Sequence, residues 1–203
     1  MSNCIFVETG QCGNQLGFAL LDSLYNHLAD EKDGMSSMNM ETFFHHPSSG
    51  PPVARAVCLD TEPKVINESL QKAGKSSKWR LHPRSVAYRH GGAGNNWALG
   101  YEMASGEFLE TSINLVRREL EHCDASQTLV FMHSVAGGTG SGLGTKMSEA
   151  CEDEFHQATR VNIAVAPYHF GEVVVQHYNA LLCLSKVSAA SHGTLVRLNL
   201  FWV

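Results

Sequence analysis

The chain has 203 residues, of which 43% are hydrophobic, and it carries 15 Lys plus Arg against 20 Asp plus Glu. This length and composition suit a globular domain with a substantial core. The formal net charge of -5, with no concentrated basic stretch, gives no electrostatic basis for binding nucleic acid or an anionic membrane.

The cysteines are scattered singly, without a Cys-x-x-Cys pair, at Cys4, Cys12, Cys58, Cys123, Cys151 and Cys183. This spacing predicts reduced thiols in the cytosol and neither a disulfide framework nor a zinc site. The apolar run at the amino terminus is short and is interrupted by Glu8, so we expect no signal peptide. No stretch approaches the roughly 18 apolar residues of a membrane span.

Apolar runs of strand length alternate with segments of helical periodicity, which predicts an α/β fold: a Rossmann-like, mostly parallel sheet flanked by helices. The predicted strands are residues 4–7, 54–59, 128–132 and 162–165. The turn 10–13 leads into a helix with Leu16, Leu20, Leu24 and Leu28 on its apolar face. Later helices are predicted around residues 109–120, 143–155 and 178–184.

Between these elements we expect loops. Residues 30–52 are rich in Ser, Met, His, Gly and Pro without clear periodicity, which predicts a long surface excursion. Pro63 stands where it can open a helix after the strand that ends near Asp60. The small residues 91–96 form another loop. The apolar residues 198–203 form either a strand or an exposed, aggregation-prone end.

The sharpest motif is the run from Ala136 to Gly142, which lies between a predicted strand and a predicted helix. Its four glycines let backbone N–H groups approach a phosphate, and its hydroxyls add donors. The amino end of a helix also favours an anion. The alternative is a plain flexible turn, but strand, glycines and helix follow in the order that a phosphate site requires.

Two familiar phosphate-binding templates do not fit. A P-loop could end at Gly74-Lys75-Ser76, but Ser69 occupies the place of its first glycine, so this segment reads as a solvated helix end. The dinucleotide fingerprint G-x-G-x-x-G needs a two-residue gap that the run at Gly138, Gly140, Gly142 and Gly144 lacks.

The run Gly137 to Gly142 resembles the signature loop of tubulins and FtsZ. Residues 10–15 resemble the first nucleotide loop of tubulins, and residues 93–98 resemble their third. Within the family, residues 62–67 and 171–176 look like delta-tubulins. The resemblance covers about Gly10 to Ser185, and it implies a tubulin/FtsZ-type GTPase domain that binds GTP or GDP with Mg²⁺.

By position, the resemblance implies a set of nucleotide contacts: Gln11, Cys12 and Gln15 beneath the nucleotide, Ala93, Gly94 and Asn95 near the terminal phosphate, Ser134, Ala136, Gly137, Gly138, Thr139, Gly140, Ser141 and Gly142 around the phosphates, and Glu172 and Gln176 near the ribose. Glu62, with Asp60 beside it, corresponds to the acid near the magnesium. The alternatives are an ordinary polar helix start for Gln11 to Gln15, a helix cap for Asp60 and Glu62, and a surface acid for Glu172.

Two features depart from the family pattern. Gln176 stands where alpha and beta tubulins carry an acid, although delta-tubulins look similar there. Residues 186–203 match no tubulin segment that we can place, so we expect a nucleotide-binding domain at 1–185 and a divergent segment at 186–203. The guanine-reading residues and the second domain of the family follow later in its members, so we expect this chain alone to hydrolyse little GTP.

The resemblance to delta-tubulins implies a cytoplasmic and cytoskeletal protein of centrioles, basal bodies and cilia, with other tubulins or centriolar proteins as partners and the nucleus as a further location. One rival is a non-catalytic interaction fragment that binds no nucleotide. A second is a Rossmann-type oxidoreductase, which the glycine spacing disfavours. His45-His46 could suggest a metal, but a third ligand at useful spacing is missing, which favours a loop.

Overall fold

The computed structural model describes residues 2–30, 35–123, 126–167 and 173–198. Its centre is a six-stranded sheet in the order β5-β4-β1-β6-β7-β8, in which every neighbouring pair is parallel. A separate antiparallel pair joins β2 and β3. The strands are β1 Ser2–Thr9, β2 Phe44–His45, β3 Val53–Ala54, β4 Ala56–Asp60, β5 Val86–Tyr88, β6 Ser126–Ser134, β7 Thr159–Ala166 and β8 Gly193–Leu198.

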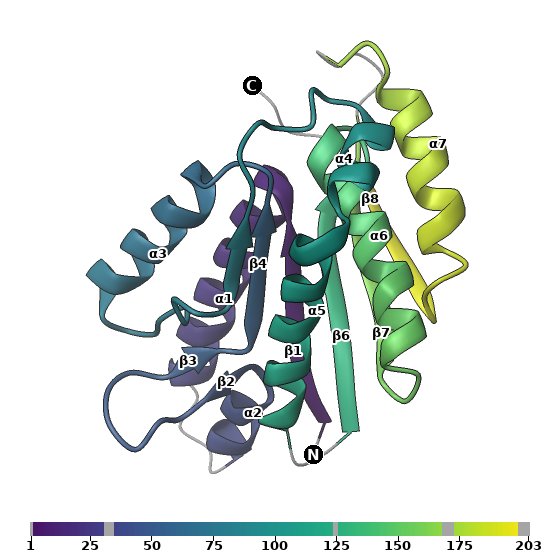
Figure 1. Cartoon of the computed structure of the whole chain (residues 1–203). Helices are drawn as coiled ribbons and strands as arrows, with labels where there is room; N and C mark the ends of the chain where they lie inside the picture. Colours follow the sequence, from purple (N-terminus) through teal and green to yellow (C-terminus); the bar gives the residue numbers. More distant parts are fainter. Residues whose placement is uncertain (1, 31–34, 124–125, 168–172, 199–203) are drawn as a thin grey trace.

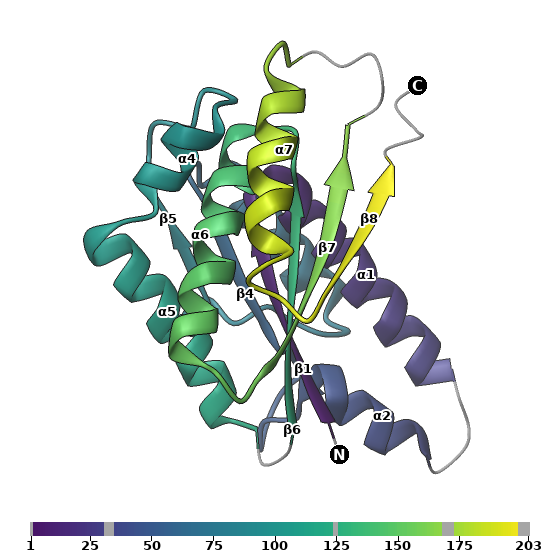
Figure 2. The same cartoon turned by 90° about the vertical axis from the view of Figure 1, so that its right-hand side faces the viewer.

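Helices cover both faces of the sheet (Figures 1 and 2). They are α1 Gly10–Asp30, α2 Met35–Phe43, α3 Lys64–Ser76, α4 Trp97–Met103, α5 Gly106–Glu121, α6 Gly138–Glu154 and α7 Gln176–Val187. Successive residues of β1 point to opposite faces of the sheet, because side chains alternate along a strand. Ile5 and Val7 pack with residues of α5 and α6, whereas Phe6 packs with residues of α1, α2 and α3. The predicted α/β parallel sheet is confirmed.

The strand order reverses direction between β1 and β6. From β1 the chain proceeds outward through β4 and β5, and it then returns to pair β6 with the other side of β1. In open α/β sheets, such a switch point leaves a crevice outside the carboxyl ends of the strands, and ligands bind there. The turns after β1 and β6, which contain Gly10 and Gly137, both lie at this edge.

The prediction that residues 30–52 form an irregular surface loop is wrong for residues 35–45, whereas residues 46–52 are irregular and partly or fully exposed. Helix α2 and strand β2 occupy residues 35–45, and the side chain of Phe44 is fully buried. Phe44 contacts Tyr25 edge-on at a ring-centroid distance of 5.7 Å and Trp79 at 5.9 Å. The polar composition hid this short element because its burial depends on tertiary partners far away in the sequence.

Two details of the predicted helices also need correction. Helix α4 was not expected as an element separate from α5. On α1, Leu16, Leu20 and Leu24 are only partly buried, and the residues buried most deeply are Gly10, Gly13, Asn14, Gly17, Leu21 and Leu28. The reason is steric: a Cβ on Gly13 would lie 2.2 Å from the Met132 carbonyl oxygen, so the small residues mark the side of α1 closest to the sheet.

Candidate functional site: loops at the carboxyl edge of the sheet

Four connections meet the carboxyl edge of the parallel sheet, following β1, β4, β5 and β6. They contain the turn at Gly10, the segment 61–63, the loop 89–96 and the glycine run. Side-chain contacts join them directly: the hydroxyls of Thr61 and Thr139 are 2.5 Å apart. The structure therefore brings together loops whose contacting residues are 78 positions apart in the sequence.

The amino end of α6 is open to a ligand. Its N-cap residue, Gly137, supplies no side-chain hydrogen bond to the first turn. The first N–H groups of a helix have no partner inside the helix, and the helix dipole makes this end attractive to anions. A Cβ placed on Gly137 would find only Asn95 Oδ1, at 3.8 Å, within 4 Å. Space beside Gly137 is therefore available at the point where an anion would be favoured.

The other glycines of the run serve protein packing. A Cβ on Gly138 would lie 2.6 Å from the Ala93 carbonyl oxygen, and one on Gly142 would lie 2.3 Å from that of Trp97. A Cβ on Gly140 would approach the Ser134 carbonyl oxygen to 2.8 Å. These glycines let α4 and the loop 89–96 approach α6 closely, which the phosphate interpretation of the sequence did not foresee.

The hydroxyl groups of the run are already bonded within the protein. Ser141 is fully buried, and its Oγ donates to the carbonyl oxygens of Gly137 and Gly138. Thr139 shares its hydrogen bond with Thr61. Ser134 Oγ accepts from the backbone N–H of Ala136 at 3.1 Å. Backbone N–H groups are therefore the donors that the run can offer most readily to a phosphate.

The loop that follows β5 needs unusual backbone angles. Gly91, Gly92 and Gly94 have φ values of 121°, 65° and 53°, and Asn95 is left-handed with φ 52°. Glycine adopts these angles without steric cost, and asparagine tolerates the left-handed region better than most residues. The Ala93 carbonyl oxygen then accepts from Asn96 N–H at 2.9 Å. This loop, expected near the terminal phosphate, is shaped by its glycines.

Asn179 of α7 holds two of the loops against each other. Its side chain is buried, and its Nδ2 donates to the carbonyl oxygens of Asn95 and Ala136, both at 2.8 Å. Its Oδ1 accepts from Trp97 N–H at 2.9 Å. No role for Asn179 is predicted from the sequence, because an isolated asparagine in a helix carries no local signal for such distant partners.

The first loop also contacts the glycine run. Gly10 has φ 72°, and a Cβ on it would lie 2.8 Å from Gly140 N. Of the residues predicted to lie beneath the nucleotide, Gln11 and Gln15 are exposed, and Cys12 is partly buried. Asn14, which was not predicted, is fully buried and donates to the carbonyl oxygens of Gly10 at 2.8 Å and Leu59 at 3.1 Å. It connects the ends of β1 and β4.

The two acids predicted near magnesium differ in environment. Asp60 is buried, and burial raises its pKa to about 6, although backbone hydrogen bonds oppose this shift. Its Oδ1 accepts from Thr61 N–H at 2.7 Å. Glu62 is exposed, and a Cβ on Gly92 would lie 2.6 Å from its Oε1. The alternative of a helix cap is not supported, because α3 has no side-chain cap hydrogen bond.

Of the two residues predicted near the ribose, Gln176 and Glu172, the structure describes only Gln176. Gln176 is buried and begins α7, one turn before Asn179. Glu172 lies outside the described residues. Among the described residues, no group of three or more His, Cys, Asp or Glu side chains could hold a metal ion. Magnesium commonly takes one or two carboxylates together with phosphate oxygens and water, so an exposed acid such as Glu62 beside a phosphate loop suits it.

Residues 3–202 match the GTPase domain of the Tubulin/FtsZ family, and the chain belongs to that family. It is 38% identical over 204 residues to the tubulin delta chain of Homo sapiens, covering 96% of this chain and 45% of that protein. It is 33% identical to the tubulin beta-1 chain of Colletotrichum graminicola, with the same coverage of both chains, and 30% identical to the tubulin epsilon chain of Homo sapiens, covering 93% and 42%.

The chain therefore spans less than half the length of these curated relatives. Within the described ranges, no helix combines the length and apolar character that crossing a membrane would require.

Proposed function

We propose that the chain binds GTP or GDP, with the phosphates against the amino end of α6. The observation that carries this proposal is the uncapped helix start at Gly137, at the switch point of a parallel sheet, with space beside it. Around that point stand the loop 89–96, held by Asn179, and the turn at Gly10. The match to a GTPase domain supports guanine over adenine as the base.

The nucleotide contacts in this proposal are those predicted from the sequence. Backbone groups of the segment from Ser134 to Gly142 and of the loop containing Ala93, Gly94 and Asn95 meet the phosphates. Gln11, Cys12 and Gln15 lie beneath the nucleotide, and Glu172 and Gln176 lie near the ribose. We place this function in residues 1–185 and treat 186–203 as a divergent segment.

Mg²⁺ is the second component that we propose. It would neutralise phosphate charge, with Glu62 as its protein partner, most simply through water. The exposed Glu62 carboxylate beside Gly92 fits this role. Asp60 is buried and engaged by the Thr61 N–H, so it fits better as a group that fixes the end of β4.

We further propose a cytoskeletal role in the cytoplasm like that of delta-tubulins, at centrioles, basal bodies and cilia, with other tubulins or centriolar proteins as partners. The similarity to tubulin delta chains supports it. For the 203-residue chain alone we expect slow GTP hydrolysis. Phosphoryl transfer to water depends on a positioned water molecule, and the described acids at this edge, Asp60 and Glu62, are assigned to structure and magnesium.

The alternative is an interaction protein that keeps the fold without binding nucleotide. It gains support from the dense protein contacts of Gly138, Gly140 and Gly142, which would persist without a ligand. Calorimetric titration of the purified chain with GTP, GDP and ATP in the presence of Mg²⁺ separates the two. The proposal predicts binding of guanine nucleotides that ATP cannot match. If circular dichroism shows that the chain is folded and none of the three nucleotides binds, the alternative is supported.

A further inference from the structure

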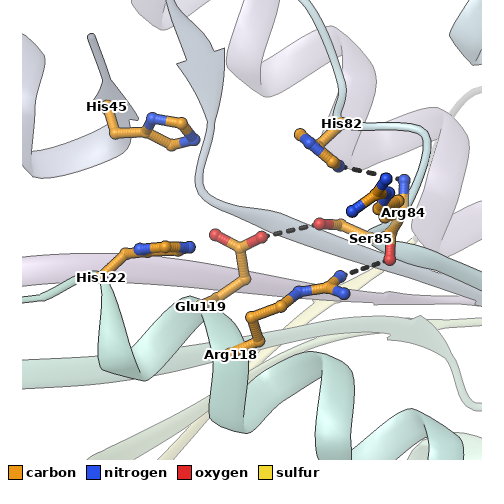
Figure 3. A pocket seen from close by; sticks show the side chains of 7 residues that line it. All are labelled: His45, His82, Arg84, Ser85, Arg118, Glu119 and His122. Atoms are coloured by element: carbon orange, nitrogen blue, oxygen red, sulfur yellow. Dashed lines mark hydrogen bonds between the residues drawn. The ribbon is translucent and has the colours of Figure 1, made fainter. Parts of the chain in front are cut away.

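A second polar site lies at the opposite edge of the sheet. A cavity of about 190 Å³ is lined by residues from β2, from the segment before β5, and from α5 with its C-cap: His45, His82, Arg84, Ser85, Arg118, Glu119 and His122 (Figure 3). Ser85 immediately precedes β5, whereas the nucleotide loops follow the strands. Because the strands are parallel, the two sites lie at different ends of the sheet.

The charges around this cavity are mostly positive. Arg84 and Arg118 line it, and Glu119 carries the one carboxyl group among its lining residues in the described chain. Arg55 lies close by, with its guanidinium donating to the His122 carbonyl oxygen at 3.2 Å. Arg80 adds a fourth guanidinium, whose Nε is buried without a hydrogen-bond partner among the described residues.

Some polar groups that line the cavity have hydrogen-bond partners within the described chain, and Glu119 Oε2 does not. Ser85 Oγ donates to Glu119 Oε1 at 2.7 Å, whereas Glu119 Oε2 is buried and has no hydrogen-bond partner within the described chain. Arg118 donates to the backbone carbonyl of Arg84, and the backbone N–H of Arg84 donates to His82 Nδ1 at 3.0 Å. In Figure 3 the His45 and His122 rings and the Glu119 carboxyl border the same space.

Two histidines of the cavity are partly buried and have positive neighbours. Burial lowers the pKa of His45 to about 4, and nearby Arg55, His122, His82 and Arg80 lower it further. The pKa of His82 is lowered by burial and then by Arg118, Arg84 and Arg80. Burial raises the pKa of Glu119, against the hydrogen bond from Ser85. The arginines that lower the pKa of His45 and His82 are positive groups that would attract a negative ligand.

We propose that this cavity binds a small oxyanion of the phosphate class, independently of the nucleotide loops. The guanidinium groups of Arg84 and Arg118 supply charge-assisted donors suited to such an ion. The imidazoles of the lining histidines add further donors. The volume is smaller than the roughly 300 Å³ at which pockets for drug-sized ligands begin, so it suits an ion with a few waters.

A metal ion is the competing ligand, since Glu119 and His122 have the i, i+3 spacing of known metal-binding helices. Two observations weigh against it. The described residues include no group of His, Cys, Asp and Glu with the arrangement to hold a metal. In addition, the guanidinium groups of Arg55, Arg80, Arg84 and Arg118 would repel a divalent cation.

The test is calorimetric titration of the full chain with inorganic phosphate at fixed ionic strength in chloride. Arg84→Gln, at an exposed position, should weaken binding at least tenfold, and Arg84→Gln with Arg118→Gln should abolish it. The matched control is Arg117→Gln. Arg117 neighbours Arg118 on α5 but is ion-paired with Glu154, so this variant should leave phosphate affinity unchanged. Unchanged affinity in the double variant, with the fold retained by circular dichroism, would overturn the proposal.

Glu119→Gln separates an anion from a cation. Removal of the negative charge should tighten phosphate binding several-fold, whereas a metal site would lose affinity for Zn²⁺. Zn²⁺ binding that Glu119→Gln abolishes, together with no phosphate binding, would contradict the proposal. Acetate serves as the second probe. A much higher affinity for phosphate than for acetate supports a ligand of the phosphate class, and an equal or higher affinity for acetate overturns that assignment. Nucleotide titrations of the same variants should match the unaltered chain.

Discussion

The side-chain amide of Asn179 donates a 2.8 Å hydrogen bond to the carbonyl oxygen of Ala136, inside the glycine run. The same Nδ2 donates equally closely to the Asn95 carbonyl oxygen. A single buried side chain on α7 thereby sets the separation of the two loops that we propose face the phosphates. The geometry of the site depends on a residue that need not contact the nucleotide.

Replacement of Asn179 by Asp should weaken GTP binding about tenfold, because an ionised Asp keeps the shape but loses both donated hydrogen bonds. Its carboxylate would also face two carbonyl oxygens. The measurement is the dissociation constant by calorimetry, with circular dichroism to verify the fold. Asn67→Asp, on the exposed surface of α3, controls for the added charge and should bind like the unaltered chain. Equal GTP affinities for the two variants would show that Asn179 does not support the nucleotide site.

The hydroxyl pair of Thr61 and Thr139, 2.5 Å apart, should contribute coupling energy between the β4–α3 segment and α6. A double-mutant cycle with Thr61→Val and Thr139→Val should give a coupling of about 1 kcal/mol in the free energy of unfolding. Urea denaturation of the four proteins measures it. Additive effects of the two substitutions would show that the contact contributes nothing to stability.

Gly142→Ala should destabilise the fold by about 2 kcal/mol or more, because the new Cβ would lie 2.3 Å from the Trp97 carbonyl oxygen and 2.4 Å from Tyr101 N. Gly74→Ala is the matched control in an exposed helix turn, where a Cβ would meet nothing within 4 Å. It should stabilise the fold by up to about 1 kcal/mol through the helix preference of alanine. Similar free energies of unfolding for the two variants would contradict this interpretation of the glycines.

The sequence was most informative where a periodic pattern and a local motif agreed. The helices beginning near Gly10 and Gly138 follow glycine turns and have readable apolar periods, and the helix beginning near Lys64 follows a proline signal. The alternation of strands and helices predicted the parallel sheet, and the run at Gly137 predicted the turn between β6 and α6, where we propose the phosphate site.

The features that the sequence did not reveal depend on distant partners. Phe44 is buried by Tyr25 and Trp79, and Asn179 acquires its role from Asn95 and Ala136. The glycines of the run looked free for a ligand, but three of them make room for α4 and neighbouring backbone. A local pattern cannot distinguish a glycine that admits a ligand from one that admits another helix.

Glu8 should make stability depend on pH. It is fully buried, its Oε1 has no hydrogen-bond partner in the described chain, and Cys58 Sγ donates to its Oε2 at 3.6 Å. Burial raises its pKa from 4.5 to about 8. The folded state therefore keeps a proton that the unfolded chain loses, and stability falls as pH rises from about 4.5 towards 8.

Between pH 6.5 and 8 the free energy of unfolding should fall by up to about 1.4 kcal/mol per pH unit. Glu8→Gln should flatten this slope, because the amide remains neutral, while the exposed control Glu121→Gln should retain it. Urea denaturation at several pH values measures the slope. A Glu8→Gln variant that keeps the slope of the unaltered chain would assign the pH dependence to another group.

The most direct test of the nucleotide site is titration of GTP into the Gly137→Asp variant. The fold should tolerate this side chain, because a Cβ at Gly137 meets only Asn95 Oδ1, at 3.8 Å. Its carboxylate would stand where we place the phosphates, so we predict unchanged thermal stability with GTP affinity lowered at least a hundredfold. The control Gly74→Asp, in open space on α3, should bind GTP normally. Full GTP affinity in folded Gly137→Asp would contradict the proposed position of the phosphates.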